Sequence, residues 1–101
     1  MAHLEHPATD HGSIVDAATQ LIDVREPDEF AAGSLPAAVN IPLERLLGDP
    51  GQLDRGRRVV LLCRSGRRSG VAAEALVAAG YPDVVNLTGG MLAIEDQGAG
   101  S

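Results

Sequence analysis

The only cysteine of the chain, Cys63, begins a six-residue run that carries three arginines, one glycine and no acid. Gly66 permits the backbone angles of a tight turn, in which several N–H groups converge on an anion. Arginine guanidinium groups attract oxyanions, and nearby positive charge favours thiolate over thiol. The pattern predicts a nucleophilic thiolate at Cys63 in an anion-binding loop. The loop residues predicted to bind the substrate are Arg64, Ser65, Gly66, Arg67 and Arg68.

The position of Cys63 in the expected fold supports this interpretation. It follows the continuous apolar run 59–62, which is typical of a parallel strand covered on both faces. From Ser69 onward the apolar residues recur at helical spacing. The loop therefore joins the carboxyl end of a strand to the start of a helix, where α/β sheets bind ligands and a helix favours anions. An inert core cysteine would need neither the arginines nor the glycine.

The rest of the chain alternates between short apolar runs and helical patterns. Such alternation is typical of βαβ units and predicts a compact single α/β domain, with a central, mostly parallel sheet flanked by helices. We assign this domain to residues 13–97, with a short helix expected to start at Ser13. Residues 1–12, which carry three histidines, and residues 98–101 are predicted to be flexible tails.

Composition excludes several classes of protein. The length of 101 residues suits one domain, and a hydrophobic content of 45% is enough for a core. A net charge of −6 and an aromatic content of 2% argue against nucleic-acid binding. One cysteine excludes an internal disulfide framework and a cysteine-based zinc cluster. Since no signal-like or membrane-spanning apolar run is present, we expect a cytoplasmic protein with a reduced thiol and no membrane partner.

Five motifs, in the same order as in a known family, resemble the rhodanese domain, and in particular its single-domain bacterial sulfurtransferases. Together they extend over most of the chain, from about residue 21 to residue 97. The motifs are Leu-Ile-Asp-Val-Arg-Glu at 21–26, Glu-Phe at 29–30, Gly-Ser-Leu-Pro-Ala-Ala-Val-Asn-Ile-Pro at 33–42, Cys-Arg-Ser-Gly-Arg-Arg-Ser at 63–69, and Leu-Thr-Gly-Gly-Met at 87–91.

This resemblance implies a ping-pong sulfurtransferase reaction. Cys63 would attack the outer sulfur of thiosulfate, release sulfite and keep a persulfide, which cyanide or a thiol would then remove. The backbone N–H groups of the loop would hold the anion, and Arg64, Arg67 and Arg68 would aid its entry. No metal and no organic cofactor is implied. The expected partners are a small anionic sulfur donor, a thiol or cyanide acceptor, and a sulfur-accepting protein.

Other residues are interpreted as supports of the site. Asp23 and Arg25 match the acid and base that end a strand in the family, and Ser69 stands at the start of the helix after the loop. Two positions depart from the family, which often has His in place of Ser34 and Trp in place of Ile94. Both positions are interpreted as structural, so we expect them to affect packing more than chemistry.

Two alternatives stay open beside the sulfurtransferase. Related phosphatases and arsenate reductases also use a thiolate in a loop that ends in arginine, but their arginine stands six positions after the cysteine, where this chain has Ser69. Here the last arginine is Arg68, which leaves the shorter loop that suits sulfur. A non-catalytic interaction or sulfur-relay module is the other alternative. Because Cys63 has no second cysteine to resolve it, a persulfide there must react with an external acceptor.

Overall fold

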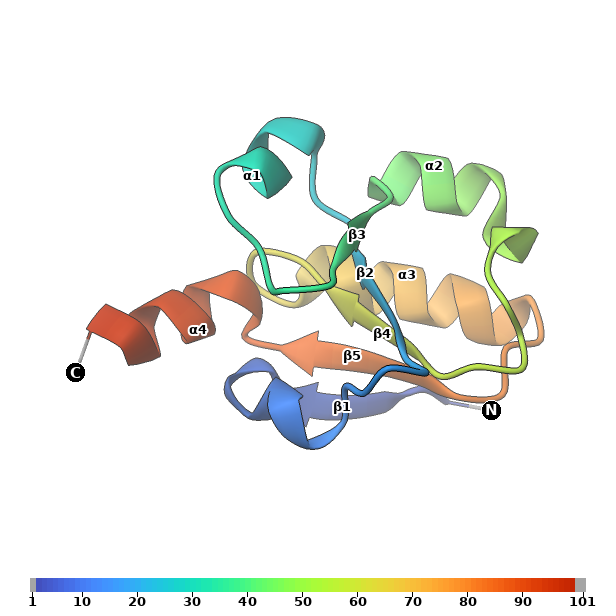
Figure 1. The fold of residues 1–101 in the computed structure, drawn as a ribbon. Helices are drawn as coiled ribbons and strands as arrows, with labels where there is room; N and C mark the ends of the chain where they lie inside the picture. The colour runs from blue at the N-terminus through green and yellow to red at the C-terminus, as the bar shows by residue number, and fades with distance from the viewer. Residues whose placement is uncertain (1, 100–101) are drawn as a thin grey trace.

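A five-stranded parallel sheet with the strand order β1-β5-β4-β2-β3 forms the centre of the molecule (Figure 1). The computed structural model describes residues 2–99. All four strand pairings in it are parallel, which confirms the predicted sheet. The strands are β1 (Leu4–Pro7), β2 (Gln20–Asp23), β3 (Val39–Asn40), β4 (Val59–Leu62) and β5 (Val84–Thr88).

Strand β4 occupies the middle of the sheet, and all four of its residues are buried. It pairs with β2 on one side, where Asp23 stands opposite Leu62, and with β5 on the other, where Asn86 stands opposite Leu61. The carboxyl ends of these three strands therefore meet at one edge of the sheet. Cys63 follows β4 at this edge, as the sequence predicted.

Helical segments cover both faces of the sheet (Figure 1). On one face α2 and α3 pack over a cluster that includes Val59, Leu61 and Cys63, and on the other η1 and α4 pack over Val60 and Leu62. Side chains alternate between the faces along a strand, so the Cys63 side chain points toward α3. The helical segments are η1 (Ala8–Ser13), α1 (Pro27–Ala31), α2 (Leu43–Gly48), η2 (Pro50–Gln52), α3 (Arg67–Ala78) and α4 (Gly90–Ala99).

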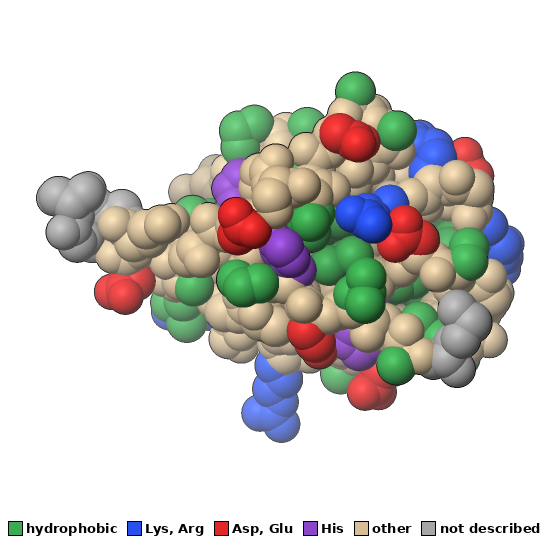
Figure 2. Space-filling view, turned by 90° about the horizontal axis from the view of Figure 1, so that it is seen from below, with side chains coloured by type: hydrophobic (Ala, Val, Ile, Leu, Met, Phe, Trp, Pro, Cys, Tyr) green, Lys and Arg blue, Asp and Glu red, His purple; other side chains and the backbone are tan. Residues whose placement is uncertain are grey.

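The start of the chain, residues 1–12, was predicted to be a flexible tail outside the domain, and the structure differs from this prediction. Strand β1 pairs with β5 from Leu4 to Pro7, and η1 follows it, so the boundary at residue 13 is wrong. This strand covers what would otherwise be the open edge of β5. Ser13 ends η1 instead of starting a helix, and its hydroxyl donates back to the Asp10 carboxylate at 2.8 Å. Figure 2 looks onto this edge and shows acidic and histidine side chains among apolar ones.

The end of the chain also departs from its prediction. Helix α4 continues to Ala99, so the first two residues of the tail predicted at 98–101 are helical, and residues 100–101 lie outside the described part. Ile94 of this helix is partly buried and packs against the cluster on the η1 and α4 face. Within residues 2–99, no helix is both long and apolar enough to cross a membrane.

Candidate active site

Cys63 is fully buried, and its sulfur accepts hydrogen bonds from the turn that follows it. The Gly66 N–H group donates to Sγ at 3.0 Å, and the Ser69 hydroxyl lies 3.3 Å from Sγ. Gly66 adopts a φ of 96°, the left-handed conformation that the sequence led us to expect of this glycine. Burial raises the pKa of the Cys63 thiol. In the thiolate form, hydrogen bonds from the Ser69 hydroxyl and from the N–H groups of Ser69, Gly66 and Ser65 outweigh that effect, so the pKa is lower than its ordinary value.

The first turn of α4 donates two backbone hydrogen bonds to the cysteine loop. Met91 donates its N–H to the Cys63 carbonyl, and Leu92 donates to the Arg64 carbonyl, each at 2.9 Å. In a trans peptide the carbonyl and the following N–H point in opposite directions. With these carbonyls facing α4, the N–H groups of Arg64 and Ser65 point away from the helix, so α4 helps to orient the face of the loop that is predicted to bind an anion.

The three arginines of the loop region do not share one environment. Arg64 and Arg67 are exposed. Arg68 instead donates a hydrogen bond from each of its two terminal nitrogens to the Glu29 carboxylate of α1, at 2.7 and 2.9 Å. The hydrogen bonds from Arg68 lower the pKa of Glu29 to about 2, against the effect of burial. Arg68 was expected to attract the substrate, but its charge is compensated by an acid that the sequence analysis did not pair with it.

Asp23 and Arg25 form a buried ion pair at the end of β2, called the bracket below. The Asp23 carboxylate accepts hydrogen bonds from Arg25 Nη2 at 2.8 Å and from the Ser34 hydroxyl at 2.7 Å. The same Arg25 nitrogen also donates to the Gly33 carbonyl at 2.7 Å. Ser34, which stands where the family often has His, thus belongs to this bracket. These contacts fix the segment between β2 and β3 beside the cysteine loop, a supporting arrangement.

Asn86, which was not predicted as a site residue, lies on β5 beside the loop. Its Oδ1 is 2.5 Å from the Ser69 hydroxyl oxygen. Its amide nitrogen donates to the Glu5 carboxylate at 2.8 Å and to the Gly66 carbonyl at 3.1 Å. A polar residue within the apolar run 84–87 was the available signal, because a buried amide needs hydrogen-bond partners.

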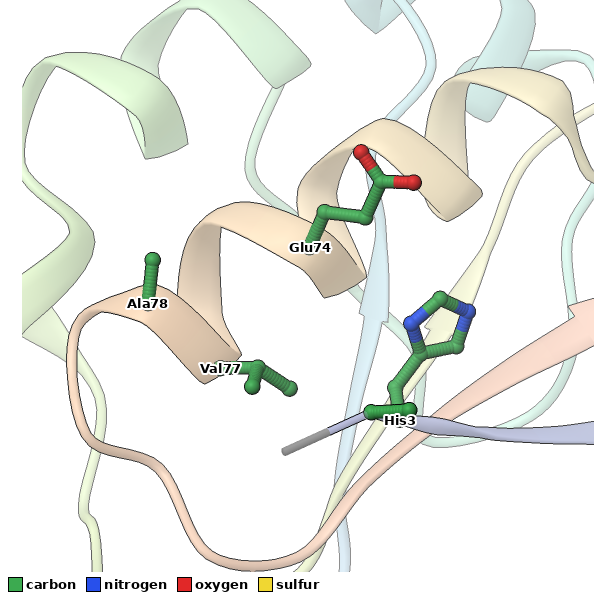
Figure 3. Close-up of a pocket in the computed structure, with 5 residues that line it drawn as sticks. His3, Glu74, Val77 and Ala78 are labelled. Atoms are coloured by element: carbon green, nitrogen blue, oxygen red, sulfur yellow. The ribbon is translucent and has the colours of Figure 1, made fainter.

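A hollow of about 430 Å³ lies away from Cys63, between the start of β1 and the last turns of α3 (Figure 3). The side chains of His3 and Glu74 face it together with the apolar Val77. His3 Nε2 also lies 2.9 Å from the Glu5 carboxylate. No group of three or more His, Cys, Asp or Glu side chains in residues 2–99 is arranged to hold a metal ion.

Comparison with known proteins agrees with the fold and the motifs. Residues 8–97 match the model of the rhodanese-like domain, and the chain belongs to this family. It is 40% identical over 73 residues to a sulfurtransferase of Allochromatium vinosum, covering 72% of this chain and 68% of that protein. It is 35% identical over 80 residues to the thiosulfate sulfurtransferase GlpE of Shewanella oneidensis, covering 79% of each.

A solved structure gives the same result for the fold. The crystal structure of a rhodanese-related protein from Thermoplasma volcanium superposes with a TM-score of 0.81 at 30% identity, covering 97% of this chain and 94% of that one. The chain spans about half the length of some other curated relatives that it matches. At the level of the family, the relatives named sulfurtransferases support a sulfurtransferase activity.

Proposed function

We propose that this chain is a thiosulfate sulfurtransferase that carries sulfane sulfur as a persulfide on Cys63. The observation that supports this most is the hydrogen bond of 3.0 Å from the Gly66 N–H to Sγ, at the centre of a loop of inward-facing N–H groups. Such preorganised donors stabilise a thiolate, and they can also stabilise the negative terminal sulfur of a persulfide. The relatives named sulfurtransferases support the same assignment.

In the first half of the reaction, the Cys63 thiolate attacks the outer sulfur of thiosulfate. A new S–S bond forms, the S–S bond of thiosulfate breaks, and sulfite leaves with the electron pair. In the second half, cyanide or a thiolate attacks the outer sulfur of the persulfide, and the Cys63 thiolate is regenerated. No external oxidant or reductant is consumed in the cyanide reaction, because one sulfur atom is transferred from thiosulfate to cyanide and sulfite is released.

The exposed arginines support the capture of an anionic donor. Arg64 and Arg67 are exposed beside a buried thiol, and the chain as a whole carries a net charge of −6. Local positive charge is therefore needed to draw thiosulfate to this edge of the sheet. Because the chain has one cysteine, the acceptor is external, and we include a protein thiol among the acceptors. One relative is named a putative sulfur carrier protein.

The residue at the end of the loop favours sulfur over phosphorus chemistry. In the related phosphatases, the loop that binds the anion ends in an arginine six positions after the cysteine. In this chain that position is Ser69, which is fully buried and lies 3.3 Å from Sγ. The arginine before it, Arg68, forms an ion pair with Glu29. The site thus lacks, among its described residues, an arginine in the place that phosphate chemistry requires.

Intact mass spectrometry after exposure to thiosulfate tests the proposal. We expect the protein to gain one sulfur atom, and to lose it to cyanide with formation of an equal amount of thiocyanate. Cys63→Ser is the control and should gain nothing. A folded wild-type protein that gains no sulfur would favour the non-catalytic module. Hydrolysis of an aryl phosphate that depends on Cys63, without persulfide formation, would favour the phosphatase.

A further inference from the structure

The Ser69 hydroxyl lies between two acceptors and can serve only one of them. Its oxygen is 2.5 Å from Asn86 Oδ1 and 3.3 Å from Cys63 Sγ, and a hydroxyl carries one hydrogen. The shorter contact has the length of a strong O–H···O bond, so the distances assign the hydrogen to Asn86. Ser69 then presents a lone pair to Cys63, which suits the thiol as a donor and not the thiolate.

The orientation of the Asn86 amide is fixed by its other partners. Its nitrogen faces the Glu5 carboxylate and the Gly66 carbonyl, both of which can only accept hydrogen bonds. A flipped amide would bring Oδ1 against these two oxygens, and that arrangement is repulsive. Asn86 and Ser69 are 3% and 0% exposed, so bulk water cannot replace either partner. The amide oxygen must therefore face Ser69.

We propose that Asn86 is a positioning residue that competes with Cys63 for the single hydrogen of the Ser69 hydroxyl. Glu5 holds Asn86 in the competing orientation, and this acid belongs to β1, which precedes the residues matched by the family. When the thiolate forms, the hydroxyl turns toward sulfur and leaves a buried amide oxygen without a donor, which opposes ionisation. The inference rests on the proposed function in that it concerns the same nucleophile.

Several charged groups also act on this thiol. Arg68 of α3 forms an ion pair with Glu29 of α1, and Arg68 interacts electrostatically with Cys63. Asp23 and Arg25 form a second pair at the end of β2. The other charged or titratable residues on the packed elements and their flanks include Arg64 and Arg67 of the loop region, Glu26 and Asp28 at the start of α1, Glu44 and Arg45 of α2, Glu74 of α3, Glu95 and Asp96 of α4, Glu5 of β1, and His3 just before β1. None of these residues is changed in the test below.

A double-mutant cycle over Asn86 and Ser69 isolates the competition from these charges. The four proteins are the wild type, Asn86→Val, Ser69→Ala and the double variant. Valine is a favourable residue in a strand. Removing the Asn86 amide leaves neither of its acceptors buried without a hydrogen-bond donor, because the Glu5 side chain is half exposed and the Gly66 carbonyl still accepts the Gly70 N–H. The readout is the rate of alkylation by iodoacetamide against pH, followed by intact mass, because the thiolate is the reacting form and Cys63 is the only thiol of the chain.

We expect Asn86→Val to raise the thiolate fraction of Cys63 about tenfold at a fixed pH below its pKa, because Ser69 is then free to donate to sulfur. Ser69→Ala should lower that fraction. In the Ser69→Ala background, Asn86→Val should have no effect. An unchanged titration of Asn86→Val, or an equal effect in both backgrounds, would overturn the inference. Asn86→Ala gives a second measurement if the valine variant does not fold.

Persulfide formation in the same four proteins separates this inference from the proposed function. A wild type that gains sulfur from thiosulfate, together with an Asn86→Val variant that titrates like it, would overturn the competition alone. A cycle that titrates as expected in a protein that gains no sulfur would overturn the sulfurtransferase alone.

Discussion

Gly90 lies directly against the peptide carbonyl of Cys63, which leaves no room for a side chain on its Cα. A Cβ there would overlap with the Cys63 carbonyl oxygen and would stand 2.5 Å from the carbonyl oxygen of Arg64. Gly90 also has a φ of 57°, in the left-handed region. This close approach lets Met91 donate to the Cys63 carbonyl at 2.9 Å. The glycine therefore allows α4 to hold the cysteine loop.

Gly90→Ala is expected to destabilise the protein by about 3 kcal/mol, the combined effect of a clash with backbone and a strained φ. It should also remove most persulfide formation, because the carbonyls that orient the loop must shift. Denaturant unfolding and intact mass after thiosulfate measure the two effects. Gly12→Ala is the control, since a Cβ on Gly12 meets nothing within 4 Å. A Gly90→Ala variant with wild-type stability and persulfide formation would contradict this account of the loop.

The sheet and the cysteine loop could be predicted because their signals are local. The continuous apolar run of β4 and the Cys-to-Arg68 segment lie next to each other in the sequence, and glycine marks the turn between strand and helix. The partners of the site could not be found in this way. Glu29 is 39 residues from Arg68, and Glu5 is 81 residues from Asn86. No periodicity or spacing relates residues that only the fold brings together.

Strand β1 was missed for a related reason. It has four residues, three of them exposed, and its sequence Leu-Glu-His-Pro carries no apolar run. Its pairing depends on the unpaired edge of β5, which is a property of the assembled sheet. Short polar segments beside a free strand edge are therefore poorly predicted from composition, although Glu5 of this strand reaches Asn86.

The ion pair of Arg68 with Glu29 changes what is expected of the individual arginines. We expect Arg67→Ala to raise the KM for thiosulfate about threefold with a smaller effect on kcat, since an exposed charge contributes up to about 1 kcal/mol. Glu29→Gln leaves Arg68 uncompensated, and it should lower KM. Steady-state kinetics at low and high salt measure both changes, which salt should reduce. An Arg67→Ala variant with unchanged KM at low salt would contradict local electrostatic capture.

The same ion pair makes stability depend on pH in the acid range. The pKa of Glu29 is about 2 in the folded protein, against an ordinary value of 4.5, so folding favours the charged carboxylate. The resulting stability is present above pH 4.5 and is lost as the pH falls from 4.5 toward 2. After allowance for solvent screening of this partly exposed pair, the loss is about 1 kcal/mol.

Glu29→Gln provides the comparison for this pH dependence. The unfolding free energy of the wild type should exceed that of the variant at about pH 6. The difference should be clearly smaller at about pH 3, because the unfolded chain takes up a proton at Glu29 there while the folded protein still resists it. Chemical denaturation at the two pH values measures it. A difference that stayed constant between them would show that Glu29 acts through packing instead of charge.

Asp23 is expected to act on stability and not on the chemical step. Asp23→Ala leaves the buried Arg25 without its carboxylate, which costs about 3–5 kcal/mol, whereas Ser34→Ala removes one hydrogen bond to a carboxylate and costs about 1.5–3 kcal/mol. Neither side chain hydrogen-bonds to Cys63, so persulfide formation per folded molecule should stay within a few-fold of the wild type. Denaturant unfolding, combined with intact mass after thiosulfate, measures both. An Asp23→Ala protein that is as stable as the wild type but gains no sulfur would show that Asp23 takes part in the reaction itself.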